Sequence, residues 1–168
     1  MSEVLEDMSV DITVTVSGTY DLSSNPPPTI SASYSGSSTP SPKGGQSVIL
    51  PNGNINLNAL NKGNNNDYSN ETNISFTLAG SITDTQGNTY TPQFSTDAGN
   101  NIHVVPAGTN PINPAPMPSG WSRTADGSRK VSIVDPDVDG QNYSYALFAQ
   151  FGTVTCPIDP SIMNRGSN

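Results

Sequence analysis

The sequence predicts an all-β protein, built as an antiparallel two-sheet β-sandwich of the immunoglobulin-like or cupredoxin-like kind. Val, Ile and Thr, which favour strands, occur 38 times in 168 residues, whereas Glu, Lys and Arg, which favour helices, occur 3 times each. Short alternating runs of apolar and polar residues are separated by Gly, Pro and Asn turns, as in sandwich domains. This composition excludes a helical bundle and a doubly wound α/β enzyme, and the length fits one domain over residues 1–168.

The N-terminal half contains short predicted strands separated by polar loops. Val10–Ser17 places Val or Ile at every second position, which is the period of a half-buried strand. A region rich in Pro, Ser and Gly follows at about 22–47, and its Asn25–Pro28 segment must be extended because proline fixes φ. Alternation also predicts strands at Thr29–Tyr34, Val48–Leu50, Ile55–Leu57 and Asn73–Leu78.

The C-terminal half repeats this organisation. Asp84–Asn88 is predicted to be a turn, and a second Pro-rich loop at about 106–120 carries five prolines between Pro106 and Pro118. Tyr143 follows an Asp-rich turn and a Gly and enters a late strand, as in the tyrosine corner of sandwich domains. Alternation predicts strands at Thr89–Phe94, Asn101–Val105, Arg129–Val134, Asn142–Phe151 and Val154–Ile158.

The charge balance limits the partners that the chain can bind. Fourteen acidic residues against six basic ones give a net charge of −8, which argues against nucleic acid and anionic membranes as partners. The segment Met1–Met8 is acidic where a signal peptide is basic, and no apolar run follows it. We therefore expect a protein made in the cytoplasm without a signal peptide, which then works there in an assembly or at a virion surface.

The residues that carry most enzyme chemistry are scarce. His103 is the only histidine and lies in a strand-like run, where a partly buried structural role is the favoured interpretation. Cys156 is the only cysteine, so it forms no intrachain disulfide, and its apolar surroundings favour a core position over a nucleophile. We expect no catalytic residues, no enzymatic activity and no cofactor other than a calcium ion, considered next.

One candidate metal site lies in a turn. Asp135, Asp137 and Asp139 alternate before Gly140 and resemble the first half of an EF-hand calcium loop. Ala146 stands where that loop has its bidentate Glu, which removes a strong ligand. The sequence leaves open a calcium site and a plain acidic turn, and it favours the turn.

Two features indicate contacts with other molecules. Trp121 follows a rigid proline-rich segment, so an exposed ring there would stack on a sugar or insert into a protein partner. A Trp that caps the end of the sandwich is the alternative, and it is the interpretation that the sequence favours. Pro26, Pro27 and Pro28 form a stiff extended segment, and Pro106–Pro118 forms another. Such segments lose little entropy on docking, so we expect at least one of the two to contact another chain.

The C-terminal third resembles a known sequence family. Val134-Asp-Pro-Asp, Tyr143-Ser-Tyr-Ala-Leu147 and the ending Asp159-Pro-Ser-Ile-Met-Asn-Arg165 resemble the DP-EP family of small bacterial proteins. The Asp-Pro-x-Ile ending is also similar to the AidA/PixA inclusion-body proteins. The first resemblance implies no catalytic residues, and the second implies a β-sandwich that self-associates in the cytoplasm.

Together these observations predict a non-enzymatic structural or interaction protein that acts within an assembly. A phage capsid-decoration or other virion protein fits this description, as does a bacterial self-assembling protein. The predicted partners are other protein chains, in a homo-oligomer or a capsid-like assembly. The alternative is a carbohydrate-binding module that uses Trp121 and a calcium ion at Asp135–Asp139.

Overall fold

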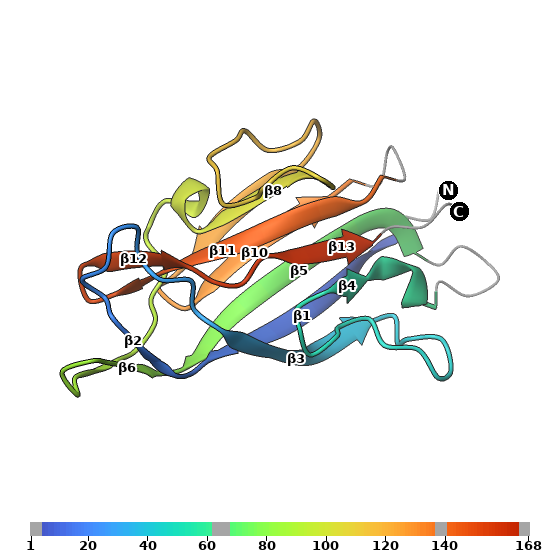
Figure 1. Ribbon diagram of the computed structural model, residues 1–168. Helices are drawn as coiled ribbons and strands as arrows, with labels where there is room; N and C mark the ends of the chain where they lie inside the picture. The colour runs from blue at the N-terminus through green and yellow to red at the C-terminus, as the bar shows by residue number, and fades with distance from the viewer. Residues whose placement is uncertain (1–4, 62–67, 137–140, 165–168) are drawn as a thin grey trace.

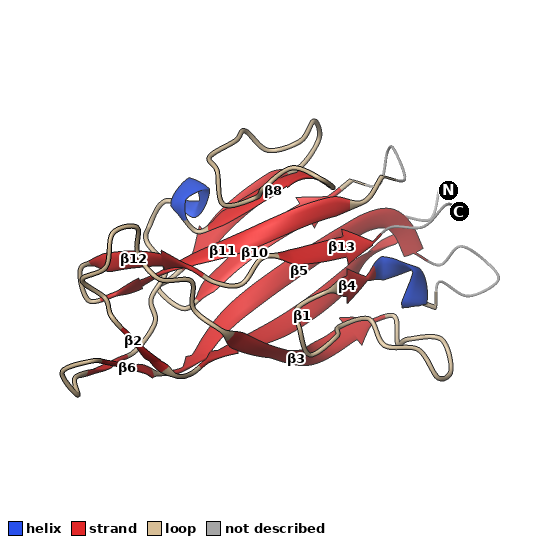
Figure 2. Ribbon diagram, viewed as in Figure 1, coloured by secondary structure: helices blue, strands red, loops and turns tan. Residues whose placement is uncertain are grey.

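The chain forms an all-β structure, as the sequence predicts. A computed structural model describes residues 5–61, 68–136 and 141–164 (Figure 1). Within this described part, strands dominate, and the helical elements are two short 3-10 turns, η1 (Leu57–Ala59) and η2 (Ala98–Asn100) (Figure 2). No helix among the described residues is long and apolar enough to cross a bilayer.

The first sheet has five strands and is organised around two long ones. Its order is β3 (Ala32–Thr39), β1 (Glu6–Val16), β5 (Tyr68–Gly80), β10 (Lys130–Asp135) and β9 (Ser122–Asp126). The predicted alternation along β1 is confirmed, because its Val and Ile residues from position 10 to 16 are all buried. β3 and β9 are the edges of this sheet, and β1 runs parallel to β5.

The second sheet is organised around β11 (Tyr143–Phe151). β11 pairs with β8 (Ile102–Pro106), β12 (Val154–Pro157) and β13 (Ser161–Asn164), and β13 continues to β4 (Ile55–Asn56). A third, small sheet contains β2 (Thr19–Tyr20), β6 (Ile82–Asp84) and β7 (Thr89–Tyr90).

The prediction of purely antiparallel sheets is wrong, because all three sheets are mixed. Each contains one parallel pair: β1 with β5, β13 with β4, and β2 with β6. Alternation reports which residues face a core, and it is the same in parallel and antiparallel strands. Strand direction depends instead on the long connections between distant segments, which leave no local pattern.

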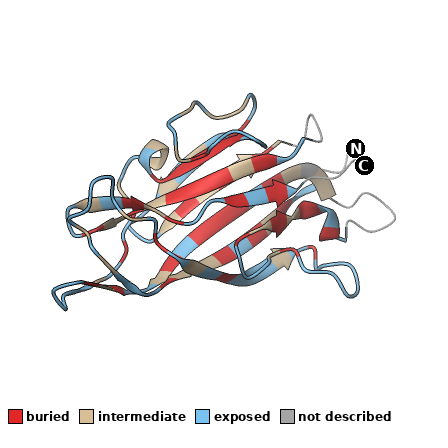
Figure 3. Cartoon of the chain, in the orientation of Figure 1, coloured by how far each residue is buried: buried red, intermediate tan, exposed pale blue. Residues whose placement is uncertain are grey.

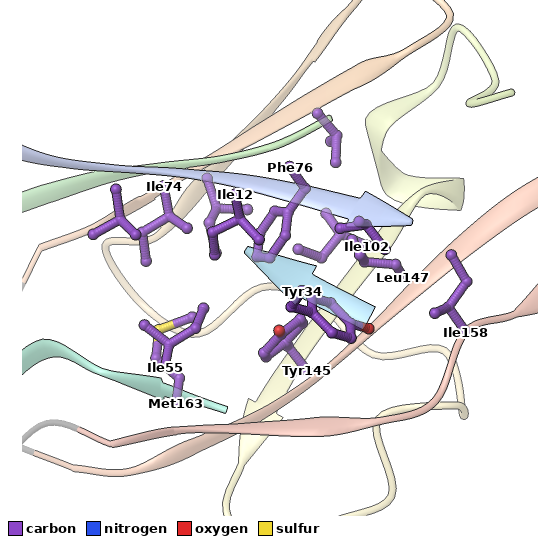
Figure 4. Close-up of a cluster of buried hydrophobic side chains, with 14 of the residues drawn as sticks. Ile12, Tyr34, Ile55, Ile74, Phe76, Ile102, Tyr145, Leu147, Ile158 and Met163 are labelled. Atoms are coloured by element: carbon purple, nitrogen blue, oxygen red, sulfur yellow. The ribbon is translucent and has the colours of Figure 1, made fainter. Parts of the chain in front are cut away.

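Side chains from the two larger sheets share one hydrophobic core (Figure 3). Phe76 of β5 and Tyr145 of β11 meet at its centre, with their ring centroids 5.2 Å apart (Figure 4). Both side chains are fully buried. The two sheets therefore stabilise each other through apolar burial between their facing surfaces.

The small third sheet ends in a turn organised by Asp84. Its Oδ1 accepts hydrogen bonds from the backbone N–H groups of Gln86 and Asn88, and its Oδ2 accepts from the Asn88 amide and the Tyr90 hydroxyl. Burial alone would raise the pKa of Asp84, but the hydrogen bonds from Asn88, Tyr90 and Gln86 outweigh it and hold the pKa below 3.8.

The hydrogen bonds to Asp84 predict how the free energy of unfolding depends on pH. Asp84→Asn is expected to lower the free energy of unfolding at neutral pH, because it removes a carboxylate that is better stabilised in the folded than in the unfolded chain. That contribution is complete above the unfolded pKa of 3.8 and is lost as the pH falls through the lower folded pKa. Urea unfolding between about pH 7 and pH 2.5 should show the deficit shrinking toward the acidic end. A deficit that stays constant over this range would contradict the assignment.

Candidate binding sites

The structure describes one of the three residues that the sequence suggested for calcium. Asp135 ends β10 and is fully buried, whereas Asp137 and Asp139 lie outside the described residues. Within the described ranges, no group of three His, Cys, Asp or Glu side chains is placed to hold a metal ion. Calcium binding at Asp135–Asp139 stays a prediction.

Trp121 lies in the core and not on an exposed surface. It is 8% exposed, and its ring packs on Tyr143 with the centroids 4.8 Å apart. A sugar needs an open aromatic face to stack on, which this burial removes. The Trp121 ring therefore offers no open face in this chain, and its contact with a glycan or a protein partner stays a prediction.

The two proline-rich segments have different surroundings. Pro26 and Pro27 are exposed, and Pro28 is half-buried. The segment Pro106–Pro118, which we call the arm, folds back over the outer face of the second sheet and buries Pro111 there. The loop above β8 in Figure 1 is this arm. The contact of either segment with another chain stays a prediction, and both segments keep exposed residues.

The single histidine and the single cysteine have structural surroundings. His103 of β8 bonds through Nδ1 to the Pro111 carbonyl at 3.0 Å and packs against Phe148, with the ring centroids 4.5 Å apart and the ring planes tilted by 51°. Because a carbonyl only accepts, Nδ1 carries the proton in this bond. Cys156 is fully buried, and burial raises the pKa of its thiol to about 11, so it is not an ionised nucleophile at neutral pH.

A groove of about 730 Å³ lies between the arm and the second sheet, and we call it the arm groove. β8 and β11 contribute its floor through His103 and Phe148, and the arm contributes a wall through Ile112 and Pro114. Polar and charged side chains also line it: Ser95, Asn100, Asn101, Arg123, Gln150 and Thr155.

Arg123 is the charged member of this lining. It projects from β9, an edge of the first sheet, and its Nη1 donates to the Ile102 carbonyl of β8 at 3.0 Å. This bond ties the edges of the two sheets and fixes the guanidinium beside the groove. Asn101 is also fixed, because it exchanges hydrogen bonds with Ser95 in both directions.

A second groove of about 480 Å³, the edge groove, follows β3. Residues of β3 from Tyr34 to Ser38 form one side, and Ser41, Pro42 and the segment 46–49 form the other. The lining contains no charged residue. At one end of the groove, the Tyr34 N–H turns away from β1 and donates to the Pro51 carbonyl at 3.2 Å.

Sequence reasoning missed most of both grooves. Arg123 lies in a strand that has no large apolar residue, and none of its side chains is fully buried. No alternation of apolar and polar residues therefore indicates this strand in the sequence. The sequence predicts that the strand containing Tyr34 ends there, because the serines that continue β3 lack an apolar face. Neither groove has a motif that could have revealed it.

Neither a comparison with protein-family models nor searches of curated proteins and of solved structures find a match to this chain. The functional assignment therefore depends on the geometry of the two grooves.

Proposed function

We propose that this chain is a non-enzymatic interaction protein that assembles with copies of itself, as a virion component or a bacterial self-assembling protein would. In this proposal the two larger sheets are the layers of an immunoglobulin-like or cupredoxin-like sandwich. The open edge of β3 receives the Asn25–Pro28 segment of the next copy. The observation that carries the proposal is the uncharged edge groove beside β3.

The backbone of β3 supplies hydrogen-bonding groups at this edge. Residues of an antiparallel edge strand alternate between facing their partner strand and facing outward. Since the Tyr34 N–H points outward to Pro51, the outward positions that follow are Gly36 and Ser38. β3 ends the order of its sheet, so no further strand among the described residues pairs with these positions. Such an edge is a template for an added strand.

The segment Asn25–Pro28 matches this groove in charge and accessibility. Neither the segment nor the edge groove carries a charged residue. Since each copy has a net charge of −8, copies repel one another at their charged surfaces, and an uncharged contact avoids this repulsion. The prolines lack N–H groups but keep their carbonyls, which can accept from the outward N–H groups of Gly36 and Ser38. Their extended backbone also loses little entropy on binding.

The positions of the two surfaces favour head-to-tail assembly. The loop between β2 and β3, which contains Asn25–Pro28, lies beside β12, whereas the loop that follows β3 lies at the other end of the molecule (Figure 1). A segment at one end of the molecule cannot reach a groove at the other end of the same copy, so it must bind the groove of another copy. Such contacts join unlike surfaces and produce rings or filaments.

The test introduces charge into the groove and compares it with charge elsewhere on β3. Ser37→Lys places a cation in the groove lining, and Ser33→Lys places one on the same strand outside it. Light scattering after size exclusion should show wild-type species larger than 17.6 kDa, a shift of Ser37→Lys toward the monomer, and no shift for Ser33→Lys. A wild-type monomer at every concentration, or equal behaviour of the two variants, would overturn the proposal.

A charge-complementation experiment identifies the occupant. Pro27→Asp should also favour the monomer, because it carries a negative charge into the uncharged groove. An equimolar mixture of Pro27→Asp with Ser37→Lys should recover a larger species, since the introduced carboxylate of one variant meets the introduced ammonium group of the other. If the mixture remains monomeric while each variant alone assembles poorly, the segment that fills the groove is not Asn25–Pro28.

A further inference from the structure

Arg123 is the one cation in the lining of the arm groove, whose other polar groups are neutral, and the Asp97 carboxylate lies just outside this lining beside Gly99. Among the described residues, an ion pair joins Lys130 to Asp126, and Arg123 forms no ion pair with any of them. Its Nη1 is held by the Ile102 carbonyl, and its other guanidinium nitrogens have no hydrogen-bond partner in the described ranges. A half-buried arginine held in this way offers a preorganised donor pair for an anion.

The neighbouring groups define the rest of a ligand. Asn100, Gln150 and Thr155 line the groove with amide and hydroxyl groups that suit hydroxyls. With Nδ1 of His103 committed to the Pro111 carbonyl, Nε2 is the ring nitrogen left to contact a ligand in the groove. The Phe148 ring supplies an apolar surface.

We infer that the arm groove binds a small hydroxylated carboxylate, such as a uronic acid unit of a glycan. The carboxylate lies on Arg123, and the hydroxyls lie on Asn100, Gln150 and His103. A single arginine matches a single negative charge. A phosphate dianion normally meets several cations or a nest of N–H groups, and the net charge of −8 disfavours polyanions further.

The groove also has the dimensions of a ligand site. Its volume of about 730 Å³ lies within the usual range for small-molecule sites, which is roughly 300–1,000 Å³. Its walls come from the second sheet, η2, β9 and the arm. The bond of His103 to the Pro111 carbonyl holds the arm, and the bond of Arg123 to the Ile102 carbonyl holds the arginine. The ligand therefore meets groups that are already in place, which lowers the entropic cost of binding.

The test compares two sugars that differ in one carboxylate. Glucuronate and glucose are titrated separately into the wild-type protein, and the chemical shifts of backbone amides lining the groove are followed by NMR. Glucuronate is expected to bind at least about tenfold more tightly than glucose, and its affinity should fall as salt is added. Equal affinities, or no saturable shift at the groove, would overturn the inference.

Variants assign the contact to Arg123. Arg123→Met removes the charge and should weaken glucuronate binding by about tenfold or more, whereas Arg129→Met, at an exposed arginine outside the groove, should leave it unchanged. Arg123→Lys keeps the charge but not the planar guanidinium, so its affinity for glucuronate should lie between those of the wild type and Arg123→Met. The Lys variant replaces the Met variant as the test if the latter does not fold. Unchanged binding by both Arg123 variants, or tighter binding of inorganic phosphate than of glucuronate, would contradict the carboxylate site.

Discussion

Gly53→Ala is expected to lower the free energy of unfolding by about 3 kcal/mol, because it combines backbone strain with a steric clash. Gly53 has φ +91°, a left-handed conformation that L residues rarely adopt. A Cβ at this position would lie 2.5 Å from the Ser161 Oγ and 2.8 Å from the Tyr34 ring. Neither neighbour can retreat easily, since Ser161 donates to the Asn52 carbonyl and Tyr34 is buried.

Gly87→Ala provides the matched control for this substitution. Gly87 has φ +87°, nearly the same as Gly53, but nothing lies within 4 Å of an added Cβ. Its substitution should cost only the backbone strain, about 1 kcal/mol. Thermal unfolding should therefore show a fall of about 9 °C for Gly53→Ala and about 3 °C for Gly87→Ala. Equal falls would mean that the clash at Gly53 is relieved without cost.

The effect at Gly53 has a structural consequence for the whole fold. The Gly53 carbonyl accepts a hydrogen bond from the Tyr145 hydroxyl of β11, and the nearby Pro51 carbonyl accepts from the Tyr34 N–H of β3. The turn at 51–54 therefore joins an edge of the first sheet to the second sheet. A side chain at Gly53 would push this turn out of the gap between the two sheets.

Phe76→Ala is expected to cost about 3–5 kcal/mol, the largest effect of a single core truncation here. Phe76 is fully buried at the centre of β5, and its loss would leave a cavity against Tyr145. Because the ring contacts the opposite sheet, its removal weakens the packing between the sheets as well as within β5. Urea unfolding monitored by circular dichroism would measure the change.

Thr77→Ala, on the next residue of the same strand, separates core packing from any general effect on β5. Thr77 is exposed, so its truncation should change the free energy of unfolding by less than about 0.5 kcal/mol. If Phe76→Ala and Thr77→Ala lowered the free energy of unfolding by similar amounts, the result would contradict a core shared by the two sheets. It would indicate that strand propensity determines the stability of β5.

The sites were less predictable than the strands. His103 and the proline-rich arm both stand out in the sequence, but nothing there indicates that the arm folds back and binds the His103 ring through the Pro111 carbonyl. The sequence leaves two alternatives for Trp121, and only its packing on Tyr143 distinguishes them. Exposure is a property of the surroundings of a side chain, and distant residues supply those surroundings.

The sequence alone is enough to predict the all-β class and the buried faces of the main strands, such as Val10–Val16, since alternation is a local property with a period of two residues. It also determined the acidic surface, which follows from composition alone. Three features come from the fold alone: the parallel pairing of β1 with β5, the place of β3 at the end of its sheet among the described strands, and the position of Arg123 beside the arm groove. Each of these depends on which distant segments pack together, and the free energy of that packing belongs to the assembled fold, not to any local pattern of residues.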